Sequence, residues 1–122
     1  MQWNLSTDTT MQTIMSYNTK EIRVNTSVFF NSIIITPQSV ANFNKTNVEL
    51  LETADFDQLV ELQPEVVLLG TGEKMIFPPP SLYQSLTKAQ IGIEVMPSGS
   101  CCRTYNLLAN DGRRVVAIIL VG

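Results

Sequence analysis

The sequence predicts a single α/β domain in which helices cover parallel strands and an antiparallel β element lies beside them. Two observations predict this fold. From Glu65 onward, short apolar runs alternate with segments of helical spacing in the order β-α-β-α-β. The first forty residues are instead rich in β-branched and aromatic residues, which is typical of strands. With 122 residues, 44% of them hydrophobic, the chain has room for one core and no second domain.

The N-terminal part of the chain predicts an arm followed by strands. Residues 1–14 show no regular hydrophobic spacing, so we expect a flexible N-terminal arm there and a single α/β domain over residues 15–122. Apolar and polar residues alternate over Glu21–Asn25, and the runs Val28–Phe30 and Ile33–Ile35 follow. These stretches predict two antiparallel strands or a small meander.

The middle of the chain predicts a helix, a buried strand and a turn. We expect a helix from Thr53, whose hydroxyl can cap the first amides, to the break at Pro64. The nearly all-apolar run Glu65–Leu69 is typical of a strand buried on both faces of a parallel sheet. The turn Gly70–Gly72 follows, and three prolines then lead into a helix around Leu82–Leu86.

Two further strands complete the predicted sheet. The runs Ile91–Met96 and Val115–Val121 predict strands, and Cys101–Ala109 predicts the helix between them. Because crossovers between parallel strands are right-handed, the three strands from Glu65 onward should run parallel, with helices covering the sheet. The last run is far shorter than the ~20 residues that a membrane-spanning helix needs. We therefore expect no membrane span.

The composition excludes several classes of function. The chain has no His, so neither a Ser-His-Asp nor a Cys-His mechanism can be assembled within it. Its two thiols, Cys101 and Cys102, are adjacent and cannot supply a zinc set, and we expect no catalytic residue, metal or cofactor. A net charge of -3 disfavours nucleic acid as a partner. The low cysteine content and the lack of Lys and Arg in residues 1–19 favour the cytoplasm over secretion.

The turn Gly70–Gly72 is the first candidate for a binding site. It follows a predicted strand at the sheet edge where open α/β sheets place their ligands. No third glycine follows at dinucleotide spacing, and Glu73-Lys74-Met75 lacks the Gly-Lys-Ser/Thr of a phosphate-binding loop. The alternative interpretation is a tight turn in which glycine permits the required backbone dihedrals.

The stretch Cys101–Asn106 carries the most varied chemistry. A thiol in the first turn of a helix, with Arg103 nearby, can have a lowered pKa and act as a nucleophile or a redox sensor. Free cysteines are also among the most buried residues, as small apolar groups. In that alternative Cys101 packs in the core, whereas Cys102 and Asn106 face outward.

Two further features suit contact with a ligand or a partner. Arg103 could clamp a carboxylate or a phosphate, or it could pair with Glu73 or Glu94 across the end of the sheet. The segment Phe77–Pro80 could present a rigid polyproline surface to a protein, or it could only stiffen the link to the next helix.

Several short segments match, in order and spacing, the motifs of a known family. The segments are Pro64–Gly72, Phe77–Pro80, Gly92–Met96, Cys102–Leu108 and Gly112–Val115, with Ile33–Pro37 as a weaker echo. On these motifs the chain resembles a small prokaryotic and mitochondrial family of unassigned biochemical function. Its mitochondrial members include assembly factor three of respiratory complex I, the NADH:ubiquinone oxidoreductase, and an animal relative is linked to adipogenesis.

The resemblance implies a fold and a kind of role. It implies three layers, with a central mixed sheet, helices on its faces and an antiparallel β element packed alongside. It implies no reaction or cofactor, because the family has none established. The assembly factor among its members implies a protein partner, and the prokaryotic members imply a bacterial protein. Whether the protein forms a homo-oligomer is left open.

Two hypotheses follow. The first is a non-catalytic binding or assembly protein that holds a protein partner at the end of the sheet. The alternative is a small-anion or nucleotide-binding protein, or an enzyme, whose site is the Gly70–Gly72 loop and the Cys101–Asn106 helix start. The candidate binding residues are Gly70, Thr71, Gly72, Phe77, Cys102, Arg103, Thr104, Tyr105 and Asn106.

Overall fold

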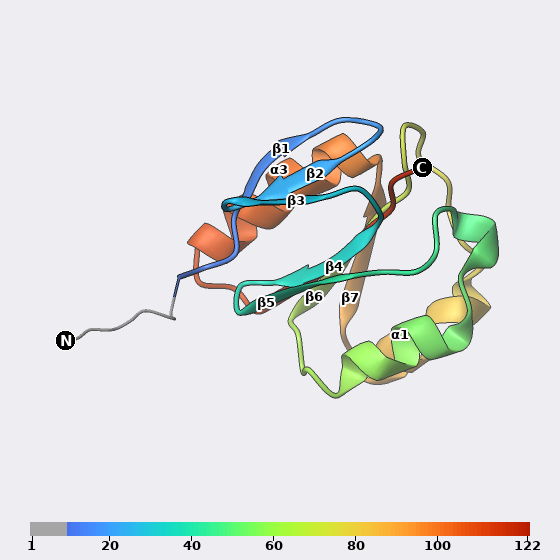
Figure 1. The fold of residues 1–122 in the computed structure, drawn as a ribbon. Helices are drawn as coiled ribbons and strands as arrows, with labels where there is room; N and C mark the ends of the chain where they lie inside the picture. The colour runs from blue at the N-terminus through green and yellow to red at the C-terminus, as the bar shows by residue number, and fades with distance from the viewer. Residues whose placement is uncertain (1–9) are drawn as a thin grey trace.

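A five-stranded mixed sheet forms the middle layer of the structure, a computed structural model that describes residues 10–122 (Figure 1). Its strands stand in the order β5-β4-β8-β6-β7. β6 pairs in parallel with β7 and β8, whereas β4 pairs antiparallel with β5 and β8. The bounds are β4 (Ile33–Thr36), β5 (Ser39–Asn42), β6 (Val66–Gly70), β7 (Gly92–Met96) and β8 (Val115–Ile119). The predicted β-α-β-α-β order and the mixed central sheet are confirmed.

A three-stranded antiparallel sheet covers part of one face of the central sheet (Figure 1). It consists of β1 (Ile14–Tyr17), β2 (Ile22–Val24) and β3 (Ser27–Phe29), in that spatial order. Asn25 starts the tight turn between β2 and β3 with a φ of 52°, a conformation that asparagine tolerates better than most residues. The predicted meander is therefore present, but Ile33–Ile35 leaves it and joins the central sheet instead.

The expected N-terminal arm falls only partly within the described residues. Residues 1–9 lie outside them. Residues 10–14 are held against the domain, where the structure differs from the expectation of a flexible segment. The Gln12 amide donates to the Pro37 carbonyl at 3.0 Å, and Ile14 is buried in the core. These contacts had no signal in the local sequence, because their partners lie far along the chain.

Three α-helices cover the two faces of the central sheet (Figure 1). α1 (Thr53–Val60) and α2 (Gln84–Lys88) lie together on one face, and α3 (Ser98–Asn110) lies on the other beside the three-stranded sheet. Short 3-10 turns at Val48–Leu50 and Pro80–Tyr83 precede α1 and α2. Within residues 10–122, no helix has both the length and the apolar character that a membrane crossing requires.

The predicted helix boundaries need two corrections. α1 ends at Val60, four residues before Pro64, because Gln63 adopts a φ of 51° that interrupts the helix. α3 begins at Ser98 rather than Cys101, because Ser98, Gly99 and Ser100 already have helical geometry. This earlier start changes which side chains of α3 face the core.

Side chains of the central strands alternate between two cores, one on each face of the sheet. On one face Leu68 and Ile119 pack into the core that α3 and the three-stranded sheet close. On the other face Leu69 and Ile118 pack into the core beneath α1 and α2. All four side chains have no exposed surface. Burial on both faces explains why β6 and β8 are continuous apolar runs in the sequence.

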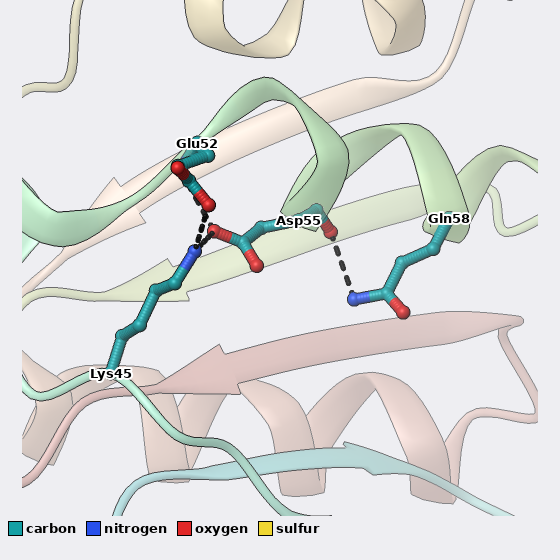
Figure 2. A network of polar contacts seen from close by, with 4 residues as sticks. All are labelled: Lys45, Glu52, Asp55 and Gln58. Carbon is teal, nitrogen blue, oxygen red and sulfur yellow. Dashed lines mark hydrogen bonds and ion pairs between the residues drawn. The ribbon is translucent and has the colours of Figure 1, made fainter.

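A polar network fixes the start of α1 to the segment that follows β5 (Figure 2). The backbone amide of Glu52 donates to Asp55 Oδ2 at 2.8 Å, so the Asp55 side chain, not the expected Thr53 hydroxyl, caps the helix start. Lys45 Nζ lies 2.6 Å from Asp55 Oδ2 and 2.9 Å from Glu52 Oε1. The hydrogen bond to Asp55, and to a smaller extent the one to Glu52, raises the pKa of Lys45. Asp55 therefore serves as a structural anchor.

Replacing Asp55 should weaken the fold through this anchor. We expect Asp55→Ala to lower the free energy of unfolding by roughly 1–2 kcal/mol, because the helix loses its cap. Urea denaturation followed by circular dichroism measures the change. Asp57→Ala, at an exposed position two residues later in the same helix, is the matched control and should change stability by less than about 0.5 kcal/mol. Equal losses in the two variants would contradict the assigned role of Asp55.

Candidate functional site

The end of β6 meets the start of α3 with almost no space between them. A Cβ atom on Gly70 would lie 2.9 Å from Ser98 Oγ and 3.0 Å from Cys101 Cβ, so a side chain cannot be accommodated there. Gly72 has a φ of +95°, a conformation that side chains rarely adopt. A side chain at position 70 would collide with α3, and the backbone at position 72 has a positive φ, so both positions of the predicted tight turn require glycine.

The polar groups of this turn bond to one another and to α3. The amide of Thr71 donates to the Met96 carbonyl at 2.9 Å, and the amide of Gly72 donates to Ser98 Oγ at 2.8 Å. The Thr71 hydroxyl donates to the Lys74 carbonyl and accepts the Ile76 amide. The amides of Thr71 and Gly72 therefore have partners within the protein, whereas a phosphate-binding loop would keep such amides free for its ligand.

Two adjoining depressions lie at this end of the molecule. The larger, of about 750 Å³, lies between the β1–β2 turn, the segment after β3 and the loop after β6. The smaller, of about 460 Å³, reaches Ser100 and Arg103 on α3. They share the walls formed by Tyr17, Thr19, Gly72 and Glu73. Figure 1 shows the loop after β6 next to the C-terminal residues, close to the β1–β2 turn. We call these depressions, with the neighbouring exposed Met75 and Phe77, the end surface.

The end surface exposes large apolar side chains. Phe77 is 72% exposed and Phe30, which lines the larger depression, is 69% exposed. Met75 and Ile76 are about half exposed. Burying such side chains releases roughly 25 cal/mol for each Å² of apolar area removed from water. Exposed apolar side chains gathered around a depression are typical of surfaces that bind another molecule.

The charges of the end surface are few and of both signs. Lys20, Lys74 and Glu73 line the larger depression, and Arg103 lines the smaller one. Arg103 Nη2 donates to Ser100 Oγ at 3.2 Å. Within residues 10–122 Arg103 forms no ion pair with Glu73 or Glu94, so the expected pairing is absent there. Its guanidinium is exposed and available to a partner.

Tyr105 and Asn106 on α3 face the three-stranded sheet instead of the end surface. Tyr105 is fully buried, and its hydroxyl donates to the Gln12 carbonyl at 2.7 Å. Burial raises the pKa of Tyr105. Asn106 accepts the Ile14 amide at 3.0 Å and donates to the Ile14 carbonyl at 2.8 Å. Thr104 is half-buried beside them on the helix. Tyr105 and Asn106 thus anchor β1 and the residues just before it, whereas Thr71, Gly72 and Arg103 line the two adjoining depressions.

Both cysteines are buried, which overturns the expectation that Cys102 faces outward. Cys102 is 5% exposed, and both thiols belong to the core between α3 and the central sheet. Because α3 begins at Ser98, neither thiol lies in its first three residues. Burial raises the pKa of Cys102 to about 12, although Arg103 partly opposes the rise. Burial also raises the pKa of Cys101. A thiol with a lowered pKa is therefore not present.

Sequence reasoning missed Tyr17, Phe30 and Ile76 as residues of the end surface. Phe30 belongs to the apolar run Val28–Phe30, which predicts a strand and burial, and no predicted element contains Tyr17. The run Met75-Ile76-Phe77 between a turn and three prolines was the available signal, because three adjacent apolar residues in a loop have no strand or helix to bury them.

A family model described as "Protein of unknown function (DUF498/DUF598)" matches residues 14–120. The chain belongs to this family. The match includes all eight strands and all three α-helices of the described structure. The family resemblance noted in the sequence is thereby confirmed.

Proteins similar to this DUF498 chain carry two kinds of name. The "13 kDa major membrane protein" of Francisella tularensis subsp. holarctica (strain LVS) is 35% identical over 74 residues, or 61% of this chain and 60% of that protein. "NADH dehydrogenase (ubiquinone) 1 alpha subcomplex assembly factor 3" of Bos taurus is 28% identical over 109 residues, or 88% of this chain and 59% of that protein. The chain thus matches about 60% of the length of these relatives.

The fold of this DUF498 chain is also that of a solved structure. A crystal structure of a protein from Bordetella parapertussis superimposes with a TM-score of 0.87 at 30% sequence identity. The superposition covers 95% of this chain and 100% of that chain. The Bordetella parapertussis protein therefore shares the mixed sheet and the three layers of this chain.

Thiol labelling tests the burial of the cysteines. We expect native protein at pH 8.5 to react with iodoacetamide far more slowly than a free thiol, because burial raises the pKa of Cys102 to about 12 and keeps it protonated. Mass spectrometry counts the modified cysteines. Unfolded protein in guanidinium chloride is the control and should be labelled at both positions. Fast labelling of the native protein would contradict the buried placement.

The close contact at Gly70 makes a second prediction. We expect Gly70→Ala to lower the free energy of unfolding by about 1–3 kcal/mol, because the new methyl group would overlap Ser98 and Cys101. Gly92→Ala is the matched control on β7, where the nearest atom would lie 3.9 Å away. Chemical denaturation of both variants measures the difference. A Gly70→Ala protein as stable as the control would show that α3 can move away from the sheet.

Proposed function

We propose that this DUF498 protein is a non-catalytic, assembly-factor-like protein that holds a protein partner on its end surface. The observation that supports this most is the pair of exposed apolar side chains, Phe30 and Ile76, that line the larger depression, with the exposed Phe77 next to Ile76 in the chain. Protein-binding surfaces combine such apolar anchors with arginine, and exposed Arg103 lies on the adjoining depression. A relative named as an assembly factor supports the same kind of role.

The chemistry of the end surface favours binding over catalysis. Its charged groups are Lys20, Lys74, Glu73 and Arg103, and the chain has no His to act as a base near neutral pH. Both thiols are buried and line neither depression. The alternative anion or nucleotide site loses support, because the amides of Thr71 and Gly72 already have partners within the protein.

The names of the relatives suggest where such a partner would be found. One relative is named a major membrane protein and another an assembly factor for a subcomplex of NADH dehydrogenase. We propose that the protein acts in the bacterial cytoplasm on a subunit of a membrane-bound respiratory enzyme. Two free, buried cysteines are compatible with a reducing compartment. Its apolar anchors would then cover part of the unassembled subunit.

Photo-crosslinking in the source cell tests the proposed surface. A benzoylphenylalanine residue in place of Phe77 should give a defined protein adduct, because this position would lie within the interface. Leu107 is the matched control position, since it is 63% exposed on α3 but lines neither depression. Mass spectrometry identifies the adduct, which we expect to be a subunit of a respiratory complex.

A second variant tests whether the adduct depends on binding at the end surface or only on the presence of a crosslinker. Arg103→Ala, combined with the crosslinker at position 77, should reduce the adduct at least about tenfold if Arg103 is one of the anchors. The same adduct from positions 77 and 107, or an adduct that is insensitive to Arg103→Ala, would refute the end surface as the binding site.

A further inference from the structure

The two sheets of the described residues have edge strands that differ in how they are protected. On β1, the Asn106 side chain bonds to both the amide and the carbonyl of Ile14. On β7, the middle of the strand carries the exposed charge of Glu94. Covering an edge or placing a charge on it are the usual ways in which proteins prevent unwanted strand pairing. β5 has neither protection.

The outer side of β5 presents free backbone groups. The Phe43 amide donates to the Ser32 carbonyl at 2.7 Å, and the register pairs Ala41 with Ile34. Because inward and outward groups alternate along an antiparallel edge strand, the amides and carbonyls of Val40 and Asn42 point away from β4. Within residues 10–122 β5 pairs only with β4 and forms the edge of its sheet, so these four groups face no neighbouring strand. By the same alternation the shorter β3 turns only Val28 outward.

The sequence around β5 is free of charge over a long stretch. No Asp, Glu, Lys or Arg occurs in residues 24–44, so the strand and its turn are neutral. Ser39, Ala41 and Asn42 are exposed. A neutral edge with free backbone groups is available for pairing with another strand.

We propose that a second copy of this chain pairs antiparallel with β5, about a twofold axis through Ala41. In this register Val40 of each copy faces Asn42 of the other, so both outward-facing residues exchange hydrogen bonds with the partner copy. The central sheet then runs continuously through the two copies. This interface uses β5 and leaves the residues of the end surface free.

The nature of β5 favours a copy of itself over an unrelated strand. Around a twofold axis the residue on the axis meets its own copy, so a charge at that position would face a like charge, and β5 has no charged residue. The residue on the axis belongs to a non-hydrogen-bonded pair, in which the Cα atoms approach to about 4.5 Å. Ala41 has a side chain small enough for this approach. Each of these properties is what self-pairing requires.

Sedimentation equilibrium at protein concentrations up to about 1 mM tests the proposal. We expect wild-type protein to form dimers as the concentration rises. Ala41→Glu and Ala41→Lys, each alone, should raise the dissociation constant at least about tenfold, because two like charges would meet on the axis. An equal mixture of the two variants should dimerise again, because opposite charges then meet. This rescue also shows that each variant is folded.

A charge change on another edge is the control. Glu94→Lys alters an exposed charge on β7 and should leave the dissociation constant of the dimer unchanged. Wild-type protein that stays monomeric at every concentration would overturn the proposal, and β5 would then be open to a strand of a different protein. Dimers of Ala41→Glu as tight as those of the wild type, or a mixture that does not associate, would overturn it too.

Discussion

The contact between Ser98 and the ends of β6 and β8 is the constraint on which the rest of the structure depends. Ser98 Oγ accepts the Gly72 amide and donates to the Leu120 carbonyl, each at 2.8 Å, and the Ser98 amide donates to the Gly72 carbonyl. One buried hydroxyl thereby joins the turn, the helix and the last strand. The joint exists only because Gly70 has no side chain, and it sets where α3 begins. Its geometry also determines the side chains that α3 presents to each neighbour.

The parallel half of the fold could be predicted because its signals are local. β6, β7 and β8 are apolar runs separated by segments of helical spacing, and burial on two faces imposes that pattern. For the antiparallel half, the presence of strands could be predicted, but not which strands pair with one another. Whether Ile34 joins the meander or the central sheet depends on its pairing with Ile118, which lies 84 positions later in the chain. No pattern in the sequence near Ile34 indicates which of the two sheets it joins.

The difference between local and long-range signals also explains which residues of the candidate site could be predicted. Thr71 and Arg103 were expected together because the carboxyl ends of parallel strands and the starts of the helices that follow share one end of a sheet. Tyr17 and Phe30 come from the antiparallel half and reach that end only through long-range packing. Cys102 and Asn106 were placed on an outer face because the spacing on α3 does not reveal the three-stranded sheet that covers it.

The position of β8 has a consequence for how the chain is made. β8 lies between β4 and β6, although it is the last strand in the sequence. During synthesis both neighbours therefore remain without their common partner until translation has passed residues 115–119. Half of the sheet cannot close around its core before that moment, and native contacts of long sequence separation form slowly. The nascent polypeptide thus exposes the unpaired edges of β4 and β6 on the ribosome, and chaperones can bind these edges during that interval.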